Sequence, residues 1–271
     1  MKHLAGDLST PLSILFQRLF DAGITPIEWK HGVISPIYKG GDRSLASNYR
    51  PITLLSVISK LMEKVVADEL MAHFEQNDLL FPGQHGFRRQ RSCTTNLLSC
   101  LSQWTSIADS GRGIDVLYLD FSKAFDRVNH DLLLLKLRHY GVHGNLLRWL
   151  TSFLDERTIS VRVQNSKSTP AKISCGVPQG SVLGPRLFLI FINDLPLYLK
   201  SEIILYADDA KVWRKVHCRN DEQVLQDDLT RVYDWSVQNQ LPLNESKCHV
   251  ISINHRGKFE CRINGQTLKR T

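Results

Sequence analysis

The chain has 271 residues, of which 42% are hydrophobic, and this is enough for one large domain or two lobes with a real core. Lysine and arginine number 34 against 27 aspartates and glutamates, so the net charge of +7 favours a polyanionic partner without requiring one. The longest apolar run, residues 187–192, is too short to span a bilayer, and the N-terminus has no apolar signal core. These features argue against a disordered, secreted or membrane-embedded chain, and we expect an intracellular protein of the nucleus or the cytoplasm.

The first part of the chain alternates predicted helix and strand. Leucines at helical spacing predict a helix over residues 8–22, and a strand follows over residues 29–39. Pro36 would place that strand at a sheet edge or a bulge, because proline cannot donate a ladder hydrogen bond. Residues 48–52, Asn-Tyr-Arg-Pro-Ile, predict a turn, and residues 54–75 predict a long amphipathic helix.

The densest basic segment of the sequence is residues 84–92. Besides a histidine and Phe87, it carries three arginines: Arg88, Arg89 and Arg91. Arginine binds phosphate bidentately and stacks on bases, as an aromatic ring also can, so the segment favours contact with nucleic acid or a triphosphate. The alternative is a solvated loop before the next helix, which is predicted over residues 92–109 with Ser92 as its cap.

A carboxylate is predicted at the end of a buried strand. Alternation and β-branching over residues 114–119 favour the strand, and Asp120 follows it directly, where open sheets present functional groups. Residues 126–140 predict a helix, with Asp126 as a cap or first-turn acid rather than a catalytic group. A further helix is predicted over residues 146–154.

A glycine-containing loop follows a predicted hairpin. Residues 158–163 alternate as a strand, and residues 171–174 form the returning strand. The loop over residues 175–181, Cys-Gly-Val-Pro-Gln-Gly-Ser, would let its backbone and Gln179 come close to a ligand; the alternative is a simple connector. The helix after the loop is predicted over residues 182–195.

Two adjacent carboxylates close the segment Tyr-Ala-Asp-Asp at residues 206–209, which lies between apolar runs. The pattern predicts a β-hairpin with the acids at its tip. Neighbouring anions on an apolar ribbon need a cation, and Mg²⁺ suits carboxylates while leaving room for substrate phosphates; a solvent-exposed turn is the alternative. A helix over residues 221–238 and short strands around Gly257 and Gly265 complete the prediction.

Three carboxylates can therefore converge: Asp120 at a strand end, and Asp208 with Asp209 at a hairpin tip. Two divalent ions about 3.5–4 Å apart, held by such acids, can stabilise the attacking and leaving oxygens of a phosphoryl transfer. In-line displacement on a triphosphate needs positioning and charge neutralisation more than covalent help. The arrangement favours a two-metal nucleotidyl transfer.

Five segments of the sequence carry a resemblance to a known family. They are NYRPITLLS at residues 48–56, QHGFR at 84–88, LDFSKAFD at 119–126, GVPQGSVLGP at 176–185 and YADD at 206–209. With these segments, in this order, the chain resembles the reverse transcriptase domain of non-LTR (LINE-type) retrotransposons over nearly its whole length. The tripeptide Ala-Asp-Asp has little specificity by itself, whereas the five segments together are highly specific.

The resemblance implies an α+β fold, the fingers and palm of a right-hand polymerase, with an antiparallel palm sheet flanked by helices. Residues 1–112 would form an N-terminal extension and the fingers. Residues 113–271 would form the palm, with residues 141–180 partly returning to the fingers. A thumb grips the primer–template duplex in the family, and we expect it to be missing from this sequence, which would leave weak processivity or none.

The resemblance also implies a metal site. Asp120 and Asp208 would hold two Mg²⁺ ions, with Mn²⁺ as an alternative, and the backbone carbonyl of Phe121 would help. Asp209 would support the primer-side ion. Lys247 would act as a general acid that protonates the departing pyrophosphate.

Other residues match the substrate contacts of the family. Phe125 matches the steric gate that excludes a 2′-hydroxyl, although a core aromatic is the alternative. Gln179 and Gly180 match the loop at the incoming nucleotide and the templating base. The fingers offer three more nucleotide-binding candidates: Arg50, Lys60 and Arg88. Contacts to template and primer are expected from Arg88, Arg89, Arg91 and Tyr206.

The resemblance thus implies an RNA-directed DNA polymerase, which adds deoxynucleotides from dNTPs to a DNA primer on an RNA template. One rival is a catalytically silent RNA-binding remnant of a retroelement. A second rival is an RNA-dependent RNA polymerase with the same palm. Phe125 disfavours the second rival, because the use of ribonucleotides needs space at the gate.

Overall fold

The computed structural model describes residues 5–255 and 259–270. The chain divides into two compact units, each assembled from two separate stretches. The first unit contains residues up to 77 and residues 129–187, and the second contains residues 78–128 and those from 188 onward. The boundary predicted at residue 112 separates fingers from palm by function, whereas the two units are separated by packing, at residues 77, 128 and 187. The assignment of fingers and palm therefore stays a prediction.

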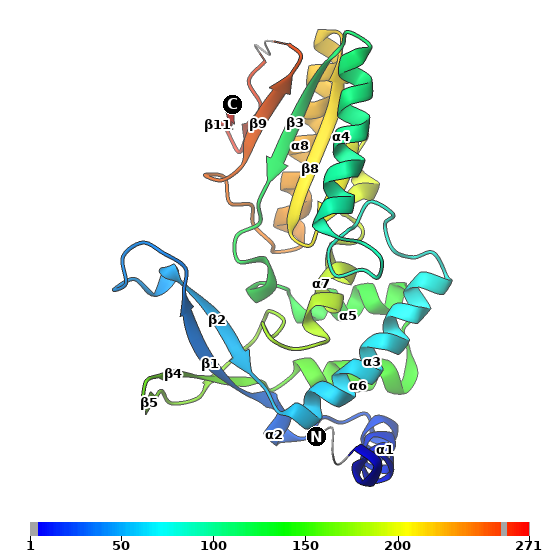
Figure 1. Cartoon of the computed structure of the whole chain (residues 1–271), viewed down its shortest axis with the longest axis vertical. Helices are drawn as coiled ribbons and strands as arrows, with labels where there is room; N and C mark the ends of the chain where they lie inside the picture. Colours follow the sequence, from blue (N-terminus) through cyan, green and yellow to red (C-terminus); the bar gives the residue numbers. More distant parts are fainter. Residues whose placement is uncertain (1–4, 256–258, 271) are drawn as a thin grey trace. The chain divides into compact units, whose positions relative to one another are not determined.

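The first unit combines helices with a small mixed sheet (Figure 1). Its helices are α1 (Ala5–Ala22), α2 (Ile27–Lys30), α3 (Val57–Gln76), α5 (His130–His139) and α6 (Gly144–Leu154). The sheet has the strand order β2-β1-β4-β5, and β6 pairs with β4. Its strands are β1 (His31–Tyr38), β2 (Tyr49–Leu54), β4 (Thr158–Val163), β5 (Ser166–Lys167) and β6 (Ala171–Lys172).

The turn predicted over residues 48–52 is wrong, because Tyr49–Leu54 form the edge strand β2. Pro51 lies opposite Pro36 in the antiparallel pair of β2 with β1. On its other side, β1 pairs with β4 only up to Ile34, so the prolines lie where few ladder bonds are needed. Pairing with β1 therefore overrides the local preference of Asn-Tyr-Arg-Pro for a turn. The prediction of an edge strand around Pro36 is wrong, because β1 lies between β2 and β4; Pro36 is tolerated there because the pairing with β4 ends at Ile34.

The second unit is built on an antiparallel sheet with the strand order β12-β9-β3-β8-β7, in which only β12 and β9 run parallel. Its strands are β3 (Gly113–Leu119), β7 (Glu202–Tyr206), β8 (Asp209–Val216), β9 (His249–Ile253) and β12 (Lys269–Arg270). Helices α4 (Cys93–Asp109) and α8 (Arg219–Gln238) cover its two faces (Figure 1). The predicted fold class, α+β with an antiparallel sheet flanked by helices, is confirmed.

The capping residues set helix boundaries that differ in part from those predicted. The helix predicted from residue 126 begins at His130, because Asn129 accepts a hydrogen bond from the backbone N–H of Leu132 at 2.9 Å and caps it. Asp126 instead ends a single 3₁₀ turn, Ala124–Asp126. Ser92 caps α4 as predicted, and its capping box with Thr95 fixes the start of that helix.

The remaining elements are short. Helix α7 (Gly184–Ile192) follows the glycine-containing loop, and a 3₁₀ turn, Leu195–Tyr198, follows α7. A two-stranded hairpin, β10 (Arg262–Ile263) and β11 (Gln266–Thr267), turns at Gly265 as predicted, with φ of +81°. Gly257 lies outside the described residues. Within the described ranges, no helix has the length and apolar character needed to cross a bilayer.

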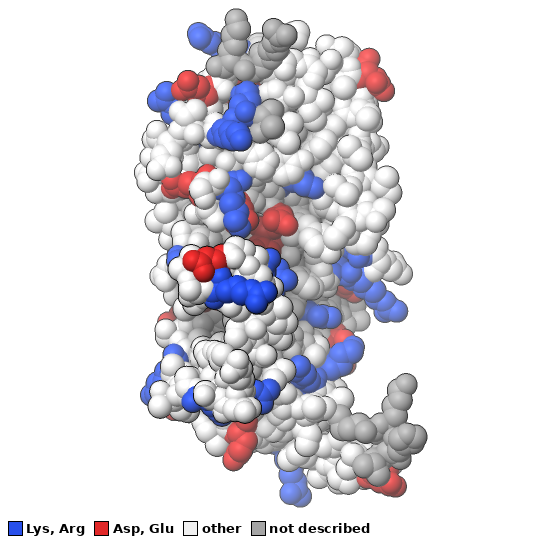
Figure 2. Space-filling view, turned by 60° about the vertical axis from the view of Figure 1, so that its left-hand side comes forward, with Lys and Arg blue, Asp and Glu red and all other residues white. Residues whose placement is uncertain are grey.

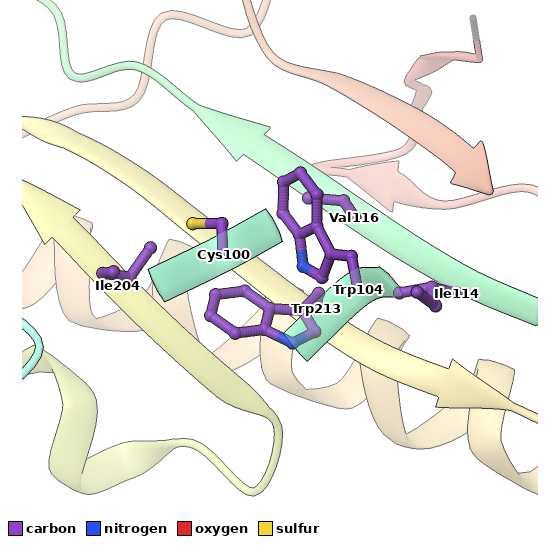
Figure 3. Close-up of a cluster of buried hydrophobic side chains, with 6 residues drawn as sticks. All are labelled: Cys100, Trp104, Ile114, Val116, Ile204 and Trp213. Carbon is purple, nitrogen blue, oxygen red and sulfur yellow. The ribbon is translucent and has the colours of Figure 1, made fainter. Parts of the chain in front are cut away.

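A cluster of six buried side chains fixes α4 to the sheet of the second unit (Figure 3). Cys100 and Trp104 from α4 pack against Ile114, Val116, Ile204 and Trp213 from three strands. The rings of Trp104 and Trp213 meet edge to face, with centroids 5.8 Å apart. This edge-to-face pair and the area it buries make the cluster a major contribution to the stability of this unit.

We expect Trp213→Ala to lower the free energy of unfolding by about 3–5 kcal/mol, because it leaves a cavity beneath α4. The matched control is Leu197→Ala in the same unit, where the side chain is 82% exposed. Chemical denaturation of both variants measures the difference. Equal midpoints for the two variants would show that the tryptophan pair does not hold α4 in place.

Candidate active site

The three predicted carboxylates lie at the ends of neighbouring strands of one sheet. Tyr206 pairs with Asp209 at the end of the β7–β8 hairpin, and Asp208 lies in the turn between them. Strand β3 pairs with β8 so that Leu119 lies opposite Ala210, and Asp120 is the next residue of the chain. The predicted hairpin with acids at its tip is confirmed, and the pairing of β3 with β8 explains why Asp120 lies beside it.

The hairpin tip is braced by residues 83–86. Gln84 is buried, and its Oε1 accepts hydrogen bonds from the backbone N–H groups of Ala207 at 3.0 Å and Gly86 at 2.7 Å. A Cβ on Gly86 would lie 2.3 Å from the nitrogen of Ala207, so only glycine fits there. Ala207 itself has φ of +56°, a conformation that this brace stabilises. Sequence reasoning assigned Gln84 no role, since nothing local marks it as buried.

Residues 242–247 hold the end of β3 in place. The carbonyl of Asp120 accepts a hydrogen bond from the N–H of Asn244 at 2.8 Å, and Phe121 forms a β-bridge with Leu243. The ammonium of Lys247 lies 3.1 Å from Oδ2 of Asp120, and the lysine side chain is 63% exposed. Lys247 is thus paired with one of the predicted metal ligands, in a position from which an exposed side chain can move.

The electrostatics of the site favour a bound cation. Burial raises the pKa of Asp208 to about 6, and the charges of Asp209 and Asp120 act in the same direction, whereas Lys247 opposes them. Partial burial also raises the pKa of Asp209, as does the charge of Asp120, whereas Lys211 and Lys247 lower it. The three acids therefore repel one another, and a cation bound among them would relieve the repulsion.

A groove of about 560 Å³ lies beside the carboxylates in the second unit. Besides Asp120 and Asp209, its polar lining includes Asn96, Tyr118, Tyr206, Lys211, Lys247 and His249. The ammonium of Lys211 donates to Oδ1 of the buried Asn96 at 2.8 Å, and the rings of Tyr118 and His249 stack with centroids 5.0 Å apart. Aromatic faces and cations beside an acidic pair can hold a nucleotide strand near the acids. Sequence reasoning missed Lys211, Asn96, Tyr118 and His249.

Phe125 lies between two other aromatic rings. It stacks on Phe188 with a centroid distance of 4.5 Å and meets Phe87 edge to face at 6.0 Å. It is partly buried, whereas Phe87 is 46% exposed. Its ring is therefore held in one place while part of it stays accessible, which fits a gate as well as a core residue.

The other predicted contacts divide between the two units. Arg88 donates to the carbonyl of Phe81 at 3.0 Å, while Arg89 and Arg91 are exposed, and all three belong to the second unit with the carboxylates. The first unit holds Gln179, Gly180, Arg50 and Lys60. On the face in Figure 2, lysine and arginine side chains are spread out and interspersed with acidic ones, so charge does not mark one surface there.

Comparison with known proteins decides the family. Residues 37–268 match the family described as "Reverse transcriptase (RNA-dependent DNA polymerase)". The chain belongs to this reverse transcriptase family. The predicted resemblance is confirmed, since the similar proteins are polymerases of non-LTR retrotransposons.

Three relatives illustrate the similarity. A Drosophila melanogaster protein named "Probable RNA-directed DNA polymerase from transposon X-element" is 34% identical over 87% of this chain and 27% of its own length. The RNA-directed DNA polymerase from mobile element jockey of the same species is 30% identical over 90% of this chain and 28% of its own length. A Pol polyprotein from retrotransposable element R2 of Popillia japonica is 27% identical over 85% of this chain and 33% of its own length. The reverse transcriptase chain therefore spans a third or less of each relative.

A solved structure supports the fold independently. The apo telomerase of Candida tropicalis, truncated from the C-terminal domain, matches with a TM-score of 0.60 at 11% sequence identity. The match covers 97% of this reverse transcriptase chain and 58% of the telomerase chain. At this level of identity, the comparison establishes a shared fold.

Reverse transcriptases use divalent metal, and the donor atoms here suit a hard cation. In the part of the chain that the structure describes, no three His, Cys, Asp or Glu side chains already form a metal-ligand set. The ammonium of Lys247 lies against Asp120, so a metal bound there would compete with it for that carboxylate. The carboxylate oxygens of Asp120, Asp208 and Asp209 are hard donors, and such donors fit Mg²⁺ or Mn²⁺.

The raised pKa of Asp208 predicts how pH and metal affect stability. The folded chain binds this proton more tightly than the unfolded chain, so the metal-free protein loses stability as pH rises from 3.8 to about 6. Mg²⁺ needs the ionised carboxylate, so its stabilising effect grows above that range. We expect millimolar Mg²⁺ to raise the melting temperature more at about pH 7.5 than at about pH 5. The same gain at both pH values would contradict the prediction.

Proposed function

We propose that this chain is the fingers-and-palm part of an RNA-directed DNA polymerase that acts inside the cell, in the nucleus or the cytoplasm. It catalyses attack of a DNA primer 3′-hydroxyl on the α-phosphate of a dNTP, directed by an RNA template, and pyrophosphate leaves. The observation that supports this most strongly is the placement of three carboxylates at the end of β3 and at the tip of the β7–β8 hairpin, beside a groove lined by aromatic and basic groups.

In this proposal Asp120 and Asp208 hold two Mg²⁺ ions, or Mn²⁺ in their place. Asp209 supports the primer-side ion, and the carbonyl of Phe121 adds a ligand. When bound, the metal supplies charge neutralisation and an activated 3′-oxygen. The protein contributes a rigid frame, since Gln84 and Asn244 fix the backbone that carries these acids.

Lys247 is the proposed general acid. Its ammonium is exposed and reaches Asp120 at 3.1 Å, so it is close enough to the acids to serve a phosphate that they bind. It would donate a proton to the departing pyrophosphate. A lysine suits this role because its ammonium is a mobile donor on a flexible stem.

The remaining roles follow the sequence motifs. Phe125 is the proposed sugar gate, and Gln179 with Gly180 contacts the incoming nucleotide. Further contacts to the dNTP come from Arg50, Lys60 and Arg88. Contacts to template and primer come from Arg88, Arg89, Arg91 and Tyr206.

Primer extension tests the proposal. An RNA template annealed to a DNA primer is offered dNTPs or NTPs, with Mg²⁺ or with EDTA. We expect dNTP incorporation that requires the metal, at low processivity. Incorporation of NTPs alone would identify an RNA-dependent RNA polymerase. Tight RNA binding without extension, by this chain and by a longer one that includes a thumb, would favour the silent remnant.

A further inference from the structure

A buried carboxylate outside the carboxylate cluster holds the glycine-containing loop of the first unit. Glu63 on α3 is 0% exposed. Its Oε2 accepts hydrogen bonds from the backbone N–H groups of Val182 at 2.8 Å and Leu183 at 3.3 Å. Its Oε1 accepts one from the hydroxyl of Ser59 at 3.1 Å. Val182 and Leu183 come directly after the loop and before α7, so Glu63 fixes the point where loop becomes helix.

Glu63 interacts electrostatically with a buried cation, Arg157. Arg157 is 2% exposed, donates to the carbonyl of Phe153 at 3.0 Å and lies over the ring of Phe153 at 4.8 Å. Burial raises the pKa of Glu63, whereas the hydrogen bonds that it accepts and the charge of Arg157 lower it. Burial lowers the pKa of Arg157 to about 10, and Glu63 opposes this. Each charge thus favours the ionised form of the other.

The loop is also fixed along its length. The N–H of Thr53 donates to the carbonyl of Gln179 at 2.7 Å, and His130 lies 2.7 Å from the carbonyl of Gly176. Gly180 has φ of +121°, and a Cβ there would lie 2.5 Å from the carbonyl oxygen of Thr53. The loop therefore has one conformation that its neighbours allow.

We propose that Glu63 is a positioning residue for nucleotide binding, which acts by fixing the backbone of the loop that carries Gln179 and Gly180. The proposal rests on the proposed function, which gives that loop its nucleotide. A buried carboxylate is a poor device for stability alone, because the ionised group loses its hydration. A carboxylate can instead fix geometry, since the hydrogen bonds that it accepts from two N–H groups are directional and hold the backbone in a single conformation.

The test compares Glu63→Gln with a matched control. Asp228 in the second unit is also fully buried, and its carboxylate accepts backbone hydrogen bonds from Lys200 at 3.0 Å and Ser201 at 2.7 Å. It also pairs with Arg231, so Asp228→Asn removes the same chemistry from another place. For both variants and Ser59→Ala we would measure amide hydrogen exchange over residues 176–184 and the KM values for dNTP and for primer–template.

We expect Glu63→Gln to speed exchange in the loop and to raise the KM for dNTP, each by about 10-fold, without changing the KM for primer–template. Ser59→Ala should act in the same direction with a smaller effect, and it stays informative if Glu63→Gln does not fold. Asp228→Asn should change neither quantity. Equal loosening of the loop by Asp228→Asn, or wild-type exchange in Glu63→Gln and Ser59→Ala, would overturn the proposal. A wild-type chain without any extension would contradict the proposed function, while the exchange data would still test Glu63.

Discussion

Asp208→Asn should abolish primer extension, by roughly 10³-fold or more, and should stabilise the metal-free protein at neutral pH. The loss of activity follows from removing a metal-holding charge at the hairpin tip. The gain in stability follows from the raised pKa of Asp208, because the folded chain at pH 7 carries a desolvated anion beside two others. Partial exposure limits this gain to about 1–2 kcal/mol. Extension assays and thermal melting of the same preparation measure both effects.

Asp227→Asn is the control for this pair of effects, since it alters a half-buried carboxylate in the same unit whose hydrogen bond from Gln223, at 2.8 Å, an asparagine oxygen can still accept. It should leave both activity and melting temperature near those of the wild type. An Asp208→Asn protein that extends primers normally would disprove the metal assignment. One that loses activity together with stability would indicate that the aspartate is structural instead.

Phe125→Val should admit ribonucleotides, with the preference for dNTP over NTP falling by about 100-fold. The ring of Phe125 is held between Phe87 and Phe188, so its removal opens space without freeing a flexible side chain that could refill it. Competition between dATP and ATP on one template measures the ratio directly.

Phe87→Val separates a gate from a support for the gate. Phe87 touches Phe125 edge to face, and its loss should loosen the ring and change selectivity less than Phe125→Val does. Unchanged selectivity in Phe125→Val, with a normal melting temperature, would show that the ring is not the gate. Lowered stability without a change in selectivity would favour the core interpretation.

The acidic tip could be predicted because its signals are local. Apolar residues flank residues 206–209, and period-two alternation ends at Asp120, so all three acids fall at strand ends or in the turn between strands. The helix cap at Ser92 and the turn at Gly265 were predictable for the same reason. In each case one or two residues have a conformational preference that the fold agrees with.

The features that the sequence did not reveal depend on pairing between distant segments. The strand containing Pro51 exists because β1 lies beside it, although its own residues favour a turn. Glu63 looks like Glu69 or any other acid of its helix until the fold buries it against Val182. Gln84 likewise braces the hairpin only because the fold places the N–H of Ala207 within hydrogen-bonding distance of it. Local composition carries no signal for any of these contacts.

The interleaved order of the two units has a consequence for synthesis on the ribosome. β3 is a buried, apolar strand whose sheet neighbours are β8 and β9. β8 is translated roughly ninety residues later, so at ordinary elongation rates β3 waits about 5–20 s for its first strand partner. During that interval α4, which is synthesised just before β3, is available to cover one face of the strand. The opposite face stays exposed and can pair with other chains and aggregate. Slower production at low temperature with abundant chaperones should therefore raise the yield of folded protein more than any change at the acidic tip.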